Sequence, residues 1–214
     1  MDTGRAPGAR RRTTPVTVRR AAPAIVVAAL SLITTVGCNP PHPPAQGIDC
    51  SVGVVGDSLM VGVEAYLPAD LAAVGCDHVF TDALTGRLTG QGAAVLEATS
   101  LSGVDLLVIG LGTNDWKDAD RLGPLVDRVM TAAAGRRVVW VNVGGRLAGK
   151  EDLNLALFGG SVRWDDLWVL DWDAWISARP HLVGSDGIHL TRGGYVERSR
   201  VIARFIATGR TEPG

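Results

Sequence analysis

A regular alternation of short apolar runs with helical segments, from residue 51 to residue 207, is the strongest constraint on the fold. Helices between successive strands favour a parallel sheet, because a parallel connection must cross back over the sheet. Two of the runs, Asp105–Ile109 and Arg137–Val141, are almost wholly apolar after their first residue, as expected for strands buried on both faces. The sequence therefore predicts an α/β fold with a helix-covered parallel sheet.

The expected elements can be placed along the chain from these runs. The predicted strands are Ser51–Val55, Asp77–Phe80, Asp105–Ile109, Arg137–Val141 and Leu167–Leu170. The predicted helices are Leu59–Val74, Gln91–Thr99, Ala119–Ala134 and Arg192–Ala207, with a loop or short helix through Lys150–Phe158. Ligands of such sheets bind outside the carboxyl ends of the strands, so the polar residues that follow the strands are the candidates for chemistry.

The N-terminal segment is typical of an exported bacterial protein. An arginine-rich stretch precedes an apolar run, residues 21–36, that is shorter than the roughly 20 residues needed to span a bilayer. The run ends at Thr35-Val36-Gly37-Cys38, which is similar to a lipoprotein box and predicts lipidation of Cys38. A cleaved signal without lipid and an uncleaved anchor are the alternatives. Each implies export across the cytoplasmic membrane, and a lipid or an anchor would hold the protein at the outer face.

The domain organisation follows from this leader and from a proline-rich stretch. Residues 1–38 are predicted to be a signal peptide or anchor, residues 39–49 a tether, and residues 50–210 one catalytic domain. Cys50 and Cys76 each precede a predicted strand, and we expect them to form a disulfide in an oxidising compartment. Two buried free thiols are the alternative. A net charge of −1 gives no basic surface of the kind that binds nucleic acid, so nucleic-acid binding is not expected. The protein is expected to be a monomer.

Ser58 is the candidate nucleophile. It stands in Gly56-Asp57-Ser58-Leu59, between the first predicted strand and a helix, where a hydroxyl would be exposed at the carboxyl edge of the sheet. A serine nucleophile needs a base to take its proton and donors for the oxyanion that forms on the acyl carbonyl. A serine at this place can also be an ordinary helix cap.

His189 is the candidate base. The chain has four histidines, of which His42 lies in the tether, His78 begins a strand and His181 follows a proline. Asp186 precedes His189 by three residues, a spacing that lets the carboxylate hold an imidazole N–H and stabilise the imidazolium. A surface loop that caps the following helix is the alternative.

Two residues are candidates for oxyanion donors. Asn114, in the Gly110–Asp115 segment after the third strand, offers a neutral side-chain amide, although an Asx turn would also explain it. Gly86 offers a backbone N–H, although a glycine in a loop is often present only because the turn requires it.

Over residues 51–208 the chain resembles the SGNH/GDSL hydrolases in the order and spacing of four segments, which are Gly56–Leu59, Gly86, Gly110–Asp115 and Asp186–His189. The resemblance implies Ser58 as nucleophile and first oxyanion donor, Gly86 and Asn114 as the second and third donors, and Asp186 and His189 as the rest of the triad. It also implies a flavodoxin-like three-layer sandwich, for which we expect five strands in the order 2-1-3-4-5. No cofactor and no metal are implied.

Shorter segments are similar to the extracytoplasmic domains of peptidoglycan O-acetyltransferases. These segments are Thr85-Gly86-Arg87, Val141-Asn142-Val143, Asp171-Trp172 and residues 187–191. The sequence thus predicts an extracytoplasmic serine esterase that hydrolyses or transfers an O-acyl group on a cell-envelope glycan, a lipid or a small molecule. A peptidoglycan O-acetyltransferase and a catalytically silent envelope-binding module are the alternatives.

Two further features bear on substrate binding. Arg87 is a candidate contact for an anionic or carbohydrate substrate. The tryptophans late in the chain either stack on sugars or pack in the core; they are Trp164, Trp168, Trp172 and Trp175.

Overall fold

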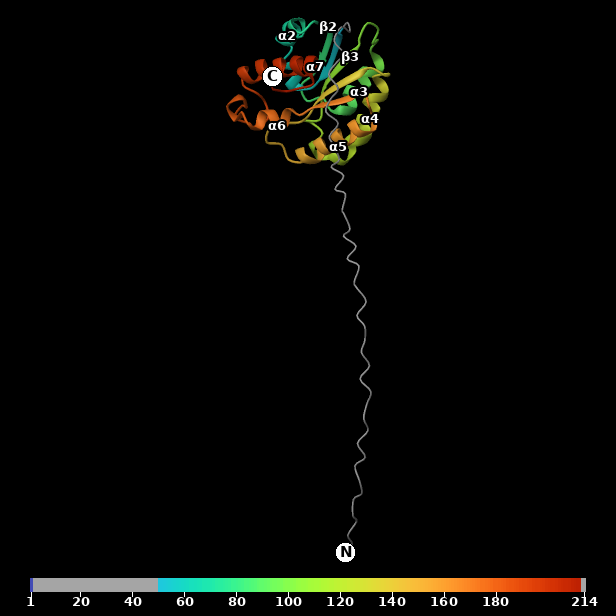
Figure 1. Ribbon diagram of the computed structural model, residues 1–214, viewed down its shortest axis with the longest axis vertical. Coiled ribbons are helices and arrows are strands. Elements are labelled where there is room, and N and C mark those ends of the chain that lie inside the picture. Colours follow the sequence, from blue (N-terminus) through green and yellow to red (C-terminus); the bar gives the residue numbers. More distant parts are fainter. Residues whose placement is uncertain (2–49, 213–214) are drawn as a thin grey trace, which may run out of the picture. The chain divides into compact units, whose positions relative to one another are not determined.

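Five parallel strands form one sheet in the order β2-β1-β3-β4-β5 (Figure 1). They are β1 (Cys50–Gly56), β2 (Cys76–Ala83), β3 (Leu106–Gly110), β4 (Arg137–Val141) and β5 (Leu167–Leu170). The computed structural model, which describes Met1 and residues 50–212, thus confirms the predicted strands, their parallel direction and their order.

Helices cover both faces of the sheet. One face is covered by α1 (Ser58–Val61), α2 (Leu67–Ala73), α6 (Trp172–Ser177) and α7 (Arg192–Thr208). The other face is covered by α3 (Thr89–Ala98), α4 (Leu122–Ala132) and α5 (Lys150–Arg163). Two short 3₁₀ helices, η1 (Trp116–Arg121) and η2 (Pro180–Leu182), complete the connections. The three-layer architecture expected from the sequence is therefore confirmed.

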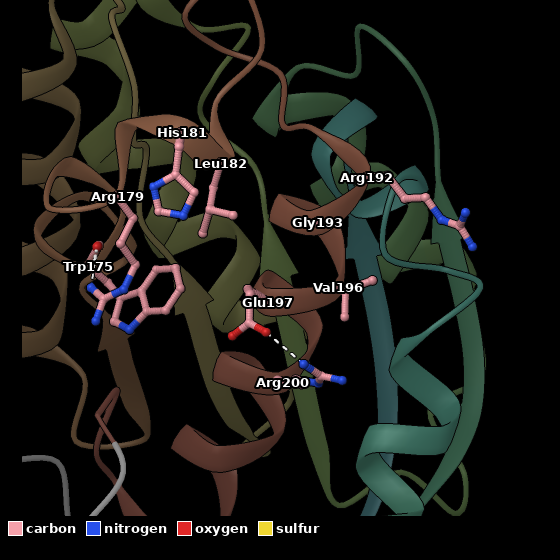
Figure 2. A pocket seen from close by; sticks show the side chains of 9 residues that line it. All are labelled: Trp175, Arg179, His181, Leu182, Arg192, Gly193, Val196, Glu197 and Arg200. Carbon is pink, nitrogen blue, oxygen red and sulfur yellow. Dashed lines mark hydrogen bonds and ion pairs between the residues drawn. The ribbon is translucent and has the colours of Figure 1, made fainter.

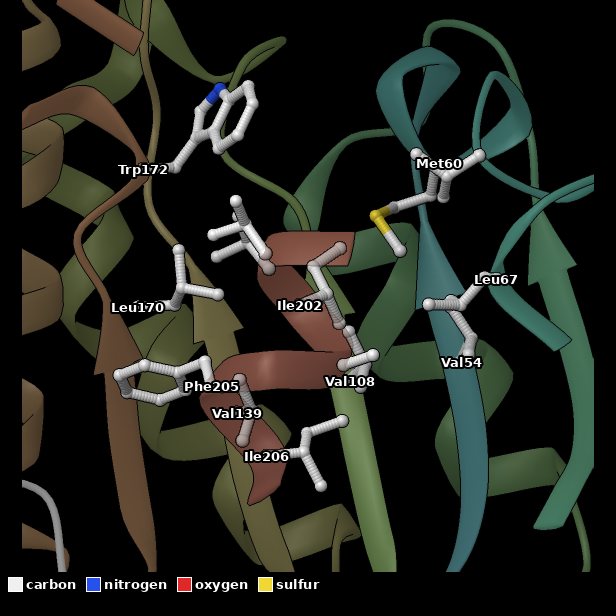
Figure 3. Close-up of a cluster of buried hydrophobic side chains, with 14 of the residues drawn as sticks. Val54, Met60, Leu67, Val108, Val139, Leu170, Trp172, Ile202, Phe205 and Ile206 are labelled. Carbon is white, nitrogen blue, oxygen red and sulfur yellow. The ribbon is translucent and has the colours of Figure 1, made fainter. Parts of the chain in front are cut away.

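The period-2 alternation of the strands builds a separate apolar core on each face. Val54 and Val108 pack under α7, in the cluster that Figure 3 shows, and both are fully buried. Leu107 and Trp140 point the other way, toward α3, α4 and α5, and are also fully buried. Burial on both faces explains why these strands are continuous apolar runs.

The predicted helix Leu59–Val74 is wrong, since the chain forms α1 and α2 with a turn between them. Pro68 lies in the first turn of α2, the part of a helix where a missing N–H costs least. Gly62 lies against Tyr195, whose ring would be 2.0 Å from a Cβ at that position. The break lets α7 approach the turn that carries Ser58.

Three other helices differ from the prediction. The expected helix Ala119–Ala134 begins as η1 and continues as α4, because Pro124 cannot donate the hydrogen bond that would join the two. The loop or short helix expected at Lys150–Phe158 is the longer α5, whose Gly160 allows close contact with Val126. The short α6, which the sequence did not predict, is capped by Asp171, whose carboxylate accepts the Ala174 N–H at 3.0 Å.

Cys50 and Cys76 form the predicted disulfide. They are paired residues at the start of β1 and β2, with Cα atoms 4.5 Å apart. The bond closes a loop of 26 residues, which restricts the unfolded chain more than the folded one.

We expect the double variant Cys50→Ala/Cys76→Ala to lose about 3 kcal/mol of unfolding free energy, as judged from the entropy of a loop of this size. Urea denaturation under non-reducing conditions measures the loss. Reduction of the unmodified protein should lower its stability by a similar amount, and reduction should leave the double variant unchanged. Equal stability of oxidised protein and double variant would contradict the prediction.

The predicted leader and tether, with Cys38, lie outside the described residues. Within residues 50–212, no helix combines the length and the apolar character needed to cross a bilayer.

Candidate active site

Ser58 is the first residue of α1, directly beyond the turn that ends β1. The preceding residue, Asp57, has extended backbone angles and its Oδ1 accepts the Leu59 N–H at 2.9 Å, so Asp57 is the helix cap. The alternative of Ser58 as a cap is therefore excluded, and its side chain is left for other contacts. Gly56 makes the sharp turn possible, since a Cβ there would lie 2.2 Å from the Met60 side chain.

The structure brings Ser58, His189 and Asp186 into one hydrogen-bonded chain. Ser58 Oγ lies 2.9 Å from His189 Nε2, although 131 positions separate the two residues. His189 Nδ1 lies 2.7 Å from Asp186 Oδ2. The alternative in which Asp186 and His189 cap α7 is excluded, because Thr191 is the cap and accepts the Gly194 N–H at 3.2 Å. This geometry suits transfer of the hydroxyl proton to the imidazole.

The loop itself holds the Asp186 carboxylate in position. Its Oδ1 accepts the backbone N–H groups of Ile188 and His189, each at 2.9 Å. The Ile188 bond is the largest cause that lowers the pKa of Asp186, followed by the His189 side chain, and the pKa falls to about 2. The carboxylate is therefore ionised at all pH values at which an esterase works, and it favours the Nδ1–H tautomer of His189.

Hydrogen-bond donors lie at the ends of the three strands nearest Ser58. Gly86 has a φ of 78° at the third position of a turn that the Arg87 N–H closes onto the Leu84 carbonyl at 3.1 Å. Within residues 50–212, neither the Ser58 nor the Gly86 N–H forms a hydrogen bond. The Asn114 amide donates one hydrogen to the Arg87 carbonyl at 3.1 Å, which holds it beside the Gly86 turn and leaves a second hydrogen for a ligand.

The Arg87 side chain forms hydrogen bonds within the protein, whereas the sequence analysis expected it to contact the substrate. Its side chain is 7% exposed, and its guanidinium donates to the Asp82 carboxylate and to the backbone carbonyls of Asp82 and Gly56. These bonds join the ends of β1 and β2 beneath the Gly86 turn. The expectation of substrate binding thus gains no support, because the donors of the guanidinium are directed into the protein.

Two buried side chains of opposite charge that the sequence analysis missed, Asp57 and Arg198, lie near the Ser58 turn without a direct ion pair between them. Arg198 of α7 is 1% exposed and Asp57 is fully buried. Burial raises the pKa of Asp57, against which a backbone hydrogen bond and the charge of Arg198 act. Burial lowers the pKa of Arg198 to about 10, so the guanidinium remains charged at neutral pH. Its carbon also lies 4.8 Å from the centre of the Trp172 ring.

A sequence signal for Arg198 existed in the helical spacing. Gly194, Arg198, Ile202 and Ile206 recur every four residues and share the buried face of α7. A charged residue in such a stripe is expected to be buried with the apolar residues beside it.

The polar residues after β4 and β5 have structural partners. Asn142 Nδ2 donates to Asp171 Oδ1 at 2.9 Å, and Asp173 Oδ1 accepts from Lys150 Nζ at 2.8 Å. Among residues 50–212, no group of three or more potential metal ligands occurs. The late tryptophans are also largely structural, since Trp172 and Trp175 are buried and stack with ring centres 5.1 Å apart.

A hollow of about 610 Å³ lies between α6, η2 and the start of α7 (Figure 2). Arg179 stacks on Trp175 in this hollow, with its guanidinium carbon 4.0 Å from the ring centre, and Arg200 bonds to Glu197. Arg192 points away from these pairs in Figure 2. The hollow is not lined by Ser58, Asp186 or His189.

No protein-family model matches the chain. In sequence, the chain is 27% identical over 144 residues to the peptidoglycan O-acetyltransferase OatA of Listeria monocytogenes. The match covers 65% of this chain but only 21% of that protein, so the chain spans a small part of this relative's length.

Solved structures share the fold at low sequence identity. The C-terminal catalytic domain of Streptococcus pneumoniae peptidoglycan O-acetyltransferase A has a TM-score of 0.58 and 16% identity, over 75% of this chain and 92% of that chain. A Clostridium thermocellum family 3 carbohydrate esterase has a TM-score of 0.60 and 17% identity, over 75% and 100%. A G-D-S-L family lipolytic protein of Desulfitobacterium hafniense has a TM-score of 0.55 and 14% identity, over 73% and 99%. The predicted resemblance to the SGNH/GDSL hydrolases is confirmed at the level of the fold.

Proposed function

We propose that this protein is an extracytoplasmic serine esterase that removes an O-acyl group from a cell-envelope glycan through an acyl-Ser58 intermediate. The observation that carries the proposal is the hydrogen-bonded chain from Ser58 through His189 to the ionised Asp186. The leader sequence and the Cys50–Cys76 disulfide support an oxidising compartment outside the cytoplasm.

The first half of the reaction forms the acyl-enzyme. Ser58 Oγ attacks the acyl carbon while its proton passes to His189 Nε2, and the carbonyl oxygen becomes an oxyanion. The free N–H groups of Ser58 and Gly86 and the remaining amide hydrogen of Asn114 are the donors proposed for that oxyanion. His189 then gives its proton to the departing alcohol oxygen, and the acyl group stays on Ser58.

The second half regenerates Ser58. Water loses a proton to His189 Nε2 and attacks the acyl carbon, the carboxylic acid leaves, and the proton returns to Ser58 Oγ. Asp186 stabilises the imidazolium in both halves and stays ionised throughout, in line with its pKa of about 2.

The openness of the site favours a bulky alcohol with a small acyl group. The side chains of His189 and Asp186 are 48% and 51% exposed, so a large substrate can reach Ser58 without entering a tunnel. Trp116, which follows Asn114 by two residues, is 44% exposed and offers an aromatic surface of the kind on which sugars stack. The late tryptophans lack this exposure, and the sequence analysis did not single out Trp116.

Transfer of the acyl group to a sugar hydroxyl is the second candidate. It is favoured by the likeness to the two peptidoglycan O-acetyltransferases, whose names state that activity. The two candidates share the acyl-Ser58 intermediate and differ only in whether water or a sugar accepts the acyl group.

A panel of esters tests the proposal. We expect O-acetylated sugars to be cleaved with a higher kcat/KM than esters of butyric or longer acids, because the site is open, with the side chains of His189 and Asp186 48% and 51% exposed. Each ester is assayed with and without a sugar acceptor, and the products are separated by mass spectrometry. Transfer products that exceed free acid would favour the transferase. Absence of turnover on every ester would refute both candidates and favour the silent binding module.

A further inference from the structure

A second cleft, of about 450 Å³, lies against the loop that carries Asp186 and His189. Gly187, which stands between those two residues, forms part of its wall. Because an extended chain spans at most about 3.6 Å per residue, Gly187 lies within roughly 7 Å of His189 at the Cα positions. Ser58, Asp186 and His189 do not line the cleft themselves, but its wall includes Gly184 and Gly187 of the loop that holds the base.

Arg146, in the loop between β4 and α5, is fixed against this wall. Its backbone N–H donates to the Gly187 carbonyl at 2.7 Å. Its side chain lies over Gly187, where a Cβ would come within 2.5 Å of Nε. Gly145 has a φ of 90° and lies so near that a Cβ there would be 2.5 Å from the Gly187 oxygen. These contacts hold the Arg146 backbone against the loop of Asp186 and His189 and place the start of the side chain over Gly187.

Arg146 forms no ion pair within residues 50–212. Its side chain is exposed. Lys150, the other cation of the cleft, is bonded to Asp173 at 2.8 Å. Ile176, Pro180 and Val183 add apolar surface. The cleft thus combines one free guanidinium with an apolar lining.

We propose that this cleft binds a carboxylate-bearing part of the ester substrate, with Arg146 as the residue that selects it. The planar guanidinium matches a carboxylate through two parallel hydrogen bonds. One free positive charge suits the single charge of a carboxylate, whereas a phosphate monoester carries nearly two at neutral pH. The inference rests on the proposed function and narrows its substrate to an acylated sugar acid or a similar anionic ester.

The test compares two substrates that differ only in the anionic group. Acetylated methyl glucuronide has a carboxylate where acetylated methyl glucoside has a hydroxymethyl group, and kcat/KM is measured for both with the full chain. We expect the wild type to prefer the glucuronide. Arg146→Gln should lower this preference about tenfold, mainly through KM, as expected from loss of one charged hydrogen-bond partner. Glutamine keeps part of the aliphatic stem over Gly187, and Arg146→Lys should restore part of the preference.

Arg192→Gln is the matched control, since Arg192 is also exposed and belongs to the other hollow. It should leave the preference unchanged. An equal loss in both variants would show a general field effect and overturn the proposal, as would a wild type without preference.

A binding measurement separates this inference from the proposed function. Methyl glucuronide, which has no ester, is titrated into the wild type and the Arg146→Gln variant and followed by NMR. If neither ester is cleaved but binding depends on Arg146, the cleft assignment stands and the esterase proposal fails. If the esters are cleaved but neither binding nor preference depends on Arg146, the esterase stands and the cleft assignment fails.

Discussion

Replacing Ser58 with alanine should lower kcat about a million-fold, the loss seen when the nucleophile of a serine triad is removed. The change deletes the atom that forms the acyl intermediate and leaves the oxyanion donors in place. Hydrolysis of the best ester of the panel measures the loss. A fluorophosphonate probe should add its mass to the wild type and not to the variant.

The fold should survive this substitution. Asp57, not Ser58, caps α1, and Ser58 is only partly buried, so the melting temperature should stay close to that of the wild type. Ser185→Ala is a matched control, because Ser185 is an exposed serine in the same loop as Asp186. It should keep both turnover and labelling. Labelling of the Ser58→Ala variant at another residue would contradict the assignment of the nucleophile.

The sheet could be predicted because its pattern is carried by each strand separately. A run such as Arg137–Val141 is apolar on both faces whatever packs against it, and the observed β4 has the same bounds. The helix boundaries depend on contacts between distant segments. Nothing local near Gly62 reveals that the Tyr195 ring fills the space beside it.

The candidate site was predictable to the extent that neighbouring residues define it. Asp186 and His189 are three residues apart, and the loop between them supplies the backbone donors that hold the carboxylate. The partners of Arg87 could not be predicted, because Asp82 and Gly56 become its neighbours only when β1 and β2 pair. The burial of Arg198 near Asp57 likewise depends on the packing of α7 against distant segments of the chain.

Replacing Asp186 with asparagine should lower kcat about ten-thousand-fold, as in a serine protease triad with the same change. The asparagine oxygen can still accept the Ile188 and His189 N–H groups, so its NH₂ group would face His189 Nδ1. That contact favours the tautomer with the proton on Nε2, which cannot accept the proton of Ser58. Steady-state kinetics measure the loss, and Asp165→Asn, at an exposed carboxylate away from the site, should show none.

The pH profile separates this role of Asp186 from a purely structural one. Because the pKa of Asp186 is about 2, protonation of this carboxylate does not account for a loss of wild-type activity above about pH 3. The carboxylate favours the charged imidazolium, so its removal should move the acid limb of kcat/KM to lower pH. A folded Asn variant that kept both the wild-type plateau and the wild-type acid limb would show that Asp186 does not act on His189. A variant with a lower plateau and an unchanged acid limb would show that Asp186 only holds the loop in position.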